Sequence, residues 1–313
     1  MRVLVIGATG MIGSHLVPQL RERGHEVIGT SRSPGSAGLL RALGAEPVVL
    51  DALDGPAVHA AVGAARPDAI ICQATALAGL SDFRHFDATF AATNRLRTEG
   101  TDIMLAAARA WGVRRIIAQS YAPNRYARRG GPVKTEDDPL DPAPPAAMRA
   151  TVEALNYLDE AVTAAGGIAL RYGSFYGDPG DGWAGLIRAR KFPVVGDGAG
   201  IWSHVHLDDA AAATVLALEH DGPAVYNITD DEPVPCRVWL PELARIAGAR
   251  PPLRIPRLMA RILAGEAVVT MATESRGAAS DRAKRELGWR LGYPSWRQGF
   301  AAAYGSPAQP AAA

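Results

Sequence analysis

The chain has 313 residues, a formal net charge of +1 and only two cysteines, and 48% of its residues are hydrophobic. A chain of this length can bury one large core or two smaller ones. Because the basic residues are dispersed and Cys72 and Cys236 lie far apart, the composition argues against a nucleic-acid-binding protein, a disulfide framework and a four-ligand metal site.

No apolar run reaches the roughly 18 uncharged residues that a membrane span needs. The chain also begins with a strand-like run instead of a charged segment followed by a long apolar stretch. We therefore expect a cytoplasmic protein that binds a small molecule and has no metal, no membrane and no nucleic acid as a partner.

The first elements have the pattern of a phosphate-binding loop. An apolar run over Val3–Ile6 leads directly into Gly7, Gly10 and Gly13, and apolar residues at helical spacing follow. A strand that ends in glycines lets the backbone approach a pyrophosphate, and the start of the next helix favours an anion through its free N–H groups and its dipole. We predict a nucleotide-binding βαβ unit. The alternative is a glycine turn that serves only close packing.

Strand-like and helical runs then alternate along the chain. The further predicted strands are Glu26–Gly29, Pro47–Leu50, Ala69–Cys72, Ile116–Gln119 and Ile168–Arg171. The predicted helices between them include Pro56–Ala65, Thr98–Trp111 and Met148–Ala165. Nearly continuous apolar strands that alternate with helices indicate an α/β fold, a doubly wound parallel sheet of the Rossmann type. Residues 130–145, rich in proline and acids, are expected to form an extended surface loop beside the site.

The alternation ends after Arg171, where Gly, Pro and Trp become frequent. We predict a dinucleotide-binding domain over residues 1–172, to which residues 203–229 return. Residues 173–313 are expected to form mainly a smaller C-terminal substrate-binding region.

Several spaced motifs together resemble the extended short-chain dehydrogenase/reductase superfamily, which includes sugar-nucleotide epimerases and dehydratases. They are GATGMIG at 7–13, LDALD at 50–54, EGTDIMLAAA at 99–108, IIAQSY at 116–121, LRYGSFYGDPG at 170–180, HVHLDDAAAA at 204–213 and VYNITDDEP at 225–233. The resemblance covers nearly the whole chain. It implies an enzyme that uses a nicotinamide cofactor to act on a small carbonyl or hydroxyl substrate.

The glycine loop and this resemblance together assign the cofactor-binding residues. They are Gly7, Thr9, Gly10, Met11, Ile12, Gly13, Ser31, Arg32, Asp51, Ala52, Gln73, Ala74, Thr75, Arg149, Tyr172, Ser174 and Phe175. An acidic residue at the end of the second strand would bind the ribose hydroxyls of NAD and repel a 2′-phosphate. The chain has Arg32 there, a planar cation that matches phosphate oxygens, with the Ser31 hydroxyl beside it. We predict NADP. NAD is the alternative if Arg32 only stacks on the adenine or faces solvent.

The catalytic pair usual in this family is absent. The resemblance implies a tyrosine and, four residues later, a lysine that lowers the pKa of the tyrosine for proton exchange with the substrate. Alignment on Glu153 places Pro145 and Arg149 at these positions. Proline has no proton to give, and arginine, with a pKa above about 12, is a poor proton relay.

Two other positions of the family's site also differ. Tyr121 stands where serine or threonine is usual, and Arg97 stands where asparagine is common. We hypothesise that Tyr121 is the catalytic acid/base and that Ser120, Arg97 or Arg149 orients or acidifies it, since a nearby cation favours the phenolate. The alternatives are Tyr126 as the acid/base, or Tyr121 as a wall residue beside the nicotinamide.

The C-terminal half offers further candidates. Trp183, Trp202 and Phe175 could form an apolar substrate wall or could simply pack in a core. His204 and His206 superficially resemble a metal cluster. The resemblance instead implies a strand followed by a helix that an aspartate caps.

Two functions remain open at this point. The complete cofactor motifs favour an NADP-dependent oxidoreductase or epimerase with an atypical catalytic set. The missing pair favours a cofactor-binding protein that performs a non-redox elimination, isomerisation or cyclisation, or that senses redox state. The resemblance also implies a homodimer formed by helices near the fourth and fifth strands.

Overall fold

The computed structural model describes residues 1–77, 83–178 and 182–305, so Pro179 and Gly180 of the motif at 170–180 lie outside the described residues. Its centre is a seven-stranded sheet in the order β12-β7-β5-β4-β1-β2-β3, in which every neighbouring pair is parallel. The strands are β1 (Arg2–Ile6), β2 (Glu26–Ser31), β3 (Glu46–Val49), β4 (Ala69–Cys72), β5 (Arg115–Tyr121), β7 (Ile168–Tyr172) and β12 (Ala224–Ile228). This order confirms the predicted doubly wound α/β fold.

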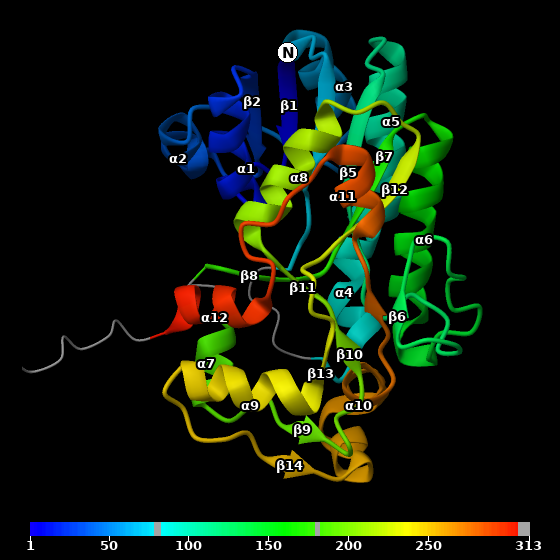
Figure 1. Cartoon of the computed structure of the whole chain (residues 1–313). Helices are drawn as coiled ribbons and strands as arrows, with labels where there is room; N and C mark the ends of the chain where they lie inside the picture. Colours follow the sequence, from blue (N-terminus) through cyan, green and yellow to red (C-terminus); the bar gives the residue numbers. More distant parts are fainter. Residues whose placement is uncertain (78–82, 179–181, 306–313) are drawn as a thin grey trace, which may run out of the picture.

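Helices cover both faces of the sheet. Figure 1 shows α1 (Met11–Glu22) and α8 (Leu207–Leu218) on one side, and α3 (Gly55–Ala65), α5 (Thr101–Ala110) and α6 (Arg149–Ala164) on the other. Successive side chains of a strand point to opposite faces. In β1, Val3 and Val5 therefore belong to the core under α1 and α8, whereas Leu4 and Ile6 belong to the core under α3 and α5.

Smaller elements complete the molecule. The other helices are α2 (Ala37–Ala42), α4 (Phe86–Arg95), α7 (Trp183–Arg188), α9 (Cys236–Ile246), α10 (Arg257–Thr273), α11 (Asp281–Leu287) and α12 (Trp296–Tyr304), and a π-helical turn over Leu96–Gly100 joins α4 to α5. The short strands are β6 (Val133–Lys134), β8 (Ser174–Tyr176), β9 (Val194–Val195), β10 (Ile201–Trp202), β11 (His204–His206), β13 (Val234–Pro235), β14 (Arg254–Ile255) and β15 (Gly277–Ala278).

A second lobe lies at the carboxyl edge of the sheet. Figure 1 shows α7, α9, α10 and α12 together below the sheet, toward the end at which β1 finishes. Aromatic rings fill its core, where the centroids of Trp202 and Trp239 are 5.3 Å apart and those of Trp183 and Trp239 are 5.5 Å apart. The glycine loop after β1 therefore faces this lobe.

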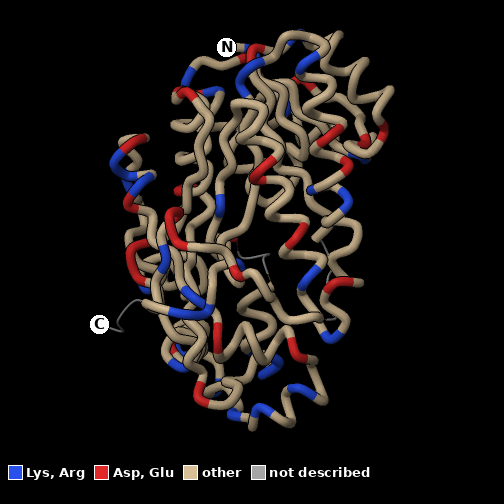
Figure 2. The backbone as a smooth tube through the Cα atoms, turned by 90° about the vertical axis from the view of Figure 1, so that its right-hand side faces the viewer, with Lys and Arg blue, Asp and Glu red and all other residues tan. Residues whose placement is uncertain are grey.

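The proline- and acid-rich segment is mostly irregular, as predicted, but it is anchored. Its β6 pairs with β15 from the C-terminal part of the chain. Lys134 is buried there and donates to the Asp138 carboxylate at 3.2 Å. Figure 2 shows Lys and Arg interspersed with Asp and Glu along the chain. Among the described helices, none is both long and apolar enough for a membrane span.

Candidate functional site

The glycines of the loop after β1 allow neighbouring backbone segments to pack closely against it. Gly7 has φ +86°, and a Cβ on it would lie 2.9 Å from the backbone of Ala74 at the end of β4. A Cβ on Gly13 would lie 2.5 Å from the Ala8 carbonyl group, so α1 could not pack as closely on β1. Gly10 caps α1, whose first turn has no acidic residue. The start of α1 therefore presents free N–H groups and a positive dipole end to an anion.

The end of β2 lies beside this loop, and β3 pairs with β2 on the side away from β1. The Thr9 hydroxyl donates to Ser31 Oγ at 3.4 Å. Arg32, directly after β2, and Asp51, after β3, are both exposed. Of the other predicted residues, Met11 is exposed, and Ile12 and Ala52 are buried in the two cores.

Gln73 at the end of β4 has an amide oxygen without a partner. Its Nε2 donates to Tyr172 Oη at 3.2 Å, and its buried Oε1 accepts no hydrogen bond from any described residue. Burial raises the pKa of Tyr172 to about 12, and its hydroxyl lies 2.6 Å from Thr214 Oγ1. Tyr172 is therefore a protonated anchor for Gln73. Thr75 and Phe175 are half-buried, and the ring of Phe175 lies 5.3 Å from that of Tyr172.

These features fit a dinucleotide cofactor. Gly7 and Gly13 leave no space for a Cβ, the start of α1 carries no competing carboxylate, and Gln73 Oε1 is a buried acceptor that a donor could satisfy.

Tyr121, the last residue of β5, reaches the same edge of the sheet. Its hydroxyl lies 3.1 Å from Ser174 Oγ on β8. Burial raises the pKa of Tyr121, while the hydrogen bond to Ser174 and the charge of Arg97 oppose that rise. The net shift is upward, so the expected acidification by a cation is outweighed by burial. The phenol is a hydrogen-bond donor at neutral pH.

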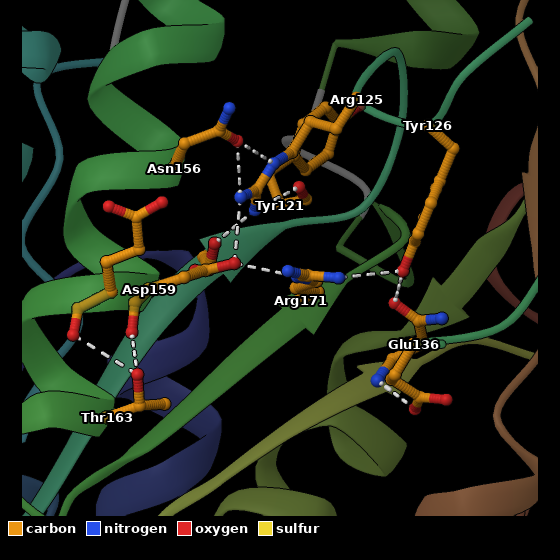
Figure 3. A network of polar contacts seen from close by, with 11 residues as sticks. Tyr121, Arg125, Tyr126, Glu136, Asn156, Asp159, Thr163 and Arg171 are labelled. Carbon is orange, nitrogen blue, oxygen red and sulfur yellow. Dashed lines mark hydrogen bonds and ion pairs between the residues drawn. The ribbon is translucent and has the colours of Figure 1, made fainter. Parts of the chain in front are cut away.

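Ser120 faces away from Tyr121 because neighbouring strand residues alternate. Its buried hydroxyl accepts a hydrogen bond from an Arg125 Nη atom at 2.8 Å. Arg125 and Arg171 both pair with Asp159 of α6, at 2.8 and 2.7 Å (Figure 3). Ser120 is thus part of a buried charge network beneath the site, and the structure does not bring its hydroxyl to that of Tyr121.

Tyr126 belongs to the same network. Its hydroxyl donates to Asn227 Oδ1 at 2.6 Å and accepts from an Arg171 Nη atom at 3.0 Å (Figure 3). Burial raises the pKa of Tyr126, and the charge of Arg171 opposes that rise. With its hydroxyl engaged on both sides, Tyr126 is held as a structural element of the network.

The two other predicted arginines have opposite environments. Arg97 lies in the π-helical turn, is 7% exposed and donates to Asn94 Oδ1 at 3.2 Å. Arg149 is exposed as the first residue of α6, and Pro145 directly precedes the turn that leads into this helix. Of these two cations, only Arg97 lies inside the molecule near Tyr121.

The residues of the second lobe mainly pack against one another. Trp202 is buried, and its Nε1 donates to a backbone carbonyl group. His204 is 1% exposed among aromatic rings. The expectation that an aspartate caps α8 is wrong, because His206 Nδ1 accepts from the Asp208 amide at 3.1 Å and takes that role. An imidazole nitrogen satisfies the same free N–H group that a carboxylate would.

A cavity of about 930 Å³ lies at the opposite edge of the sheet, at the amino ends of β5 and β7. Its lining includes Arg109, Arg115 and Gly166 and none of the predicted site residues.

Comparison with known proteins extends these observations. The profile of the family described as "NAD dependent epimerase/dehydratase family" matches residues 3–229. The 3-diazoavenalumate denitrifying reductase of a Streptomyces species is 46% identical over 310 residues, which cover 96% of this chain and 99% of the relative. The 2-alkyl-3-oxoalkanoate reductase of Stenotrophomonas maltophilia is 29% identical, over 80% of this chain and 76% of the relative. A structure of the UDP-glucose 4-epimerase of Thermus thermophilus, in complex with NAD, has the same fold, with a TM-score of 0.73 and 23% identity over 97% of this chain and 98% of that one.

Proposed function

The chain belongs to the NAD-dependent epimerase/dehydratase family, a group of nicotinamide-dependent oxidoreductases and epimerases, and we propose that it is an NADP-dependent reductase whose substrate accepts hydride without a protein acid. One combination carries this proposal. The cofactor loop is complete, whereas Pro145 and Arg149 stand at the aligned positions of the family's tyrosine and lysine.

The missing pair limits the chemistry that the site can perform. Reduction of a carbonyl group creates an oxyanion, and a positioned acid normally protonates it. The raised pKa of Tyr121 makes this phenol a weaker acid than a free tyrosine. A substrate that forms no oxyanion on reduction would not need such a donor.

A diazonium group is a substrate of this kind. A nicotinamide cofactor held by the glycine loop would supply a hydride. The carbon that gains this hydride forms a C–H bond, and dinitrogen leaves with the electron pair of the broken C–N bond. No oxyanion forms and no proton is consumed. The Streptomyces relative, named as the denitrifying reductase of a diazo compound, supports this substrate class.

The chain's own residues have defined tasks in this proposal. Gly7, Gly13 and Gln73 hold the cofactor, and Arg32 selects NADP through its 2′-phosphate. Tyr121 donates a hydrogen bond to the substrate beside the reacting group. We also propose that residues 173–313 form most of the substrate side of the site, and that the protein is a cytoplasmic homodimer.

The test is cofactor oxidation by defined substrates. Purified protein is mixed with NADPH or NADH and with an aryl diazonium salt, a ketone, an aldehyde or an enone, and the absorbance of the reduced cofactor is followed against a blank without protein. We expect NADPH oxidation with the diazonium salt, together with release of dinitrogen. Turnover of carbonyl substrates alone would contradict the proposal, and tight cofactor binding without any turnover would favour a non-redox function.

A further inference from the structure

Arg97 is a buried cation that has no ion-pair partner within the described part of the chain. It is 7% exposed, and its side chain donates a hydrogen bond to the neutral amide of Asn94. Among the described residues, no carboxylate forms an ion pair with its guanidinium group. Burying a charge is strongly unfavourable unless a partner compensates it.

The other buried cations show how this protein normally treats such a charge. Arg125 and Arg171 share the Asp159 carboxylate, and Lys134 has its own carboxylate partner four residues along the chain. Arg97 differs from these three because it has no ion-pair partner of its own among the described residues. The charges of both Arg125 and Asp159 act on it, but Asp159 is already paired with two arginines. The region beside Tyr121 therefore holds an excess of positive charge.

The surroundings of Arg97 fix its orientation without using all its donors. The π-helical turn carries it inward, and such turns are frequent at functional sites. Asn94 accepts one of its N–H groups and in turn donates to Thr151 Oγ1 at 3.0 Å. Burial and the charge of Arg125 lower the pKa of Arg97 to about 10, so that it is still cationic at neutral pH. A guanidinium group has five N–H donors, and most of them are left for a ligand.

We propose that Arg97 binds a carboxylate group of the substrate, so that the enzyme acts on small organic acids. The planar guanidinium group matches the two oxygens of a carboxylate. Binding there would place the substrate beside Tyr121. This inference rests on the proposed reductase function and names the substrate class of the same site.

The cofactor's phosphates have a different place in the fold. The glycine loop follows β1, and Arg32 follows β2, whereas Tyr121 ends β5 on the other side of β4. The cation near Tyr121 is therefore set apart from the phosphate-binding end of the cofactor site.

The test compares benzoate with benzamide, which has a similar shape and no charge. Calorimetry measures the affinity of each for the protein in complex with NADPH, using the wild type, Arg97→Gln and Arg97→Lys. The matched control is Arg95→Gln, which removes an exposed arginine two residues away that pairs with Glu99. We expect Arg97→Gln to weaken benzoate binding by about tenfold to a hundredfold, with a smaller loss for Arg97→Lys and none for the control. Benzamide affinity should not change.

Further readouts separate this role from others. If Arg97 is a carboxylate receptor, Arg97→Gln removes an unbalanced buried charge and keeps or raises the melting temperature, whereas a purely structural role would lower it. The proposal is overturned if the wild type binds benzoate no better than benzamide, or if Arg97→Gln lowers the affinities for benzoate and benzamide equally. It is also overturned if Arg97→Gln lowers the affinity for NADPH and not that for benzoate. Benzoate binding through Arg97 in a protein that reduces no substrate would support the carboxylate site and refute the reductase function.

Discussion

Replacing Asp159 with asparagine should destabilise the protein by about 3–5 kcal/mol, because two buried arginines would lose the carboxylate that they share. Arg125 and Arg171 approach Asp159 at 2.8 and 2.7 Å, and all three side chains are buried. Asparagine has nearly the same volume as aspartate, so the substitution leaves no cavity. The loss of stability would report the removed charge.

Urea denaturation of the wild type and Asp159→Asn gives the free energy of unfolding. The matched control is Asp221→Asn, since Asp221 pairs with Arg115 at 2.8 Å but its side chain is 90% exposed. An exposed pair contributes about 0–1 kcal/mol. If Asp159→Asn lost no more stability than Asp221→Asn, the reasoning about buried charge would be refuted for Asp159 and also for Arg97.

The pH dependence of this effect has a definite sign. Burial alone would raise the pKa of Asp159, but the charges of Arg125 and Arg171 lower it further than burial raises it. A carboxyl group with a depressed pKa stabilises the folded state above the unfolded value of about 3.9 and loses this contribution as the pH falls through the folded value. The difference in unfolding free energy between the wild type and Asp159→Asn should therefore stay constant from about pH 7 to pH 5.

Three further predictions concern other residues. Arg32→Asp should weaken NADPH binding at least tenfold and leave NADH affinity equal or higher, as cofactor titration would show; tighter NADH than NADPH binding by the wild type would contradict the role of Arg32. Tyr121→Phe should lower kcat with a diazonium substrate by about tenfold or less, since one hydrogen bond is lost, whereas general acid catalysis by Tyr121 would cost about a hundredfold or more. Burial lowers the pKa of His204 to about 3, so its ring is neutral in the folded protein. Because the ring takes up a proton only in the unfolded state, the free energy of unfolding should fall by about 2 kcal/mol as the pH falls from 6.5 to 5. His204→Phe should remove that part of the pH dependence in urea titrations, and an unchanged pH dependence would contradict the role of His204.

The sequence predicted the sheet well where strands were nearly continuous apolar runs. All six predicted strands are present, from β1 to β7, within one or two residues at each end. The seventh strand, β12, was not among these runs, because the polar Asn227 interrupts its apolar pattern. Helix α4 was missed as well, since its residues FDATFAATNR mix apolar, polar and β-branched side chains without a clear helical stripe.

The candidate site was predictable only in part, for reasons of geometry. Strand ends in a doubly wound sheet meet at one edge, so the placement of Gln73 and Tyr121 at the same edge as the glycine loop follows from topology. Ser120 and Tyr121 were expected to act together, although alternation along β5 sends their side chains to opposite faces. The burial of Arg97 could not be read from the sequence, because a π-helical turn shifts the face that a residue presents and the neighbouring charges indicate a solvated surface.

The two proposals together impose a condition on the substrate. A diazonium group is a cation, and the excess positive charge of Arg97 beside Tyr121 would repel it. A carboxylate on the same molecule removes this conflict, since it neutralises Arg97 while the diazonium group lies on the opposite side of the substrate. The site should therefore favour a diazonium acid over its methyl ester.

This preference can be measured as a ratio of kcat/KM values for the acid and the ester in the wild type and in Arg97→Gln. We expect the wild type to prefer the acid by at least about tenfold, which corresponds to one charge-assisted hydrogen bond. Arg97→Gln should lose this preference by slowing the acid, and removal of the repelling cation should leave the ester's kcat/KM equal or higher. A neutral ester group binds a guanidinium group more weakly than a carboxylate does. A wild type that prefers the ester would therefore show that the charge of Arg97 does not act on the substrate.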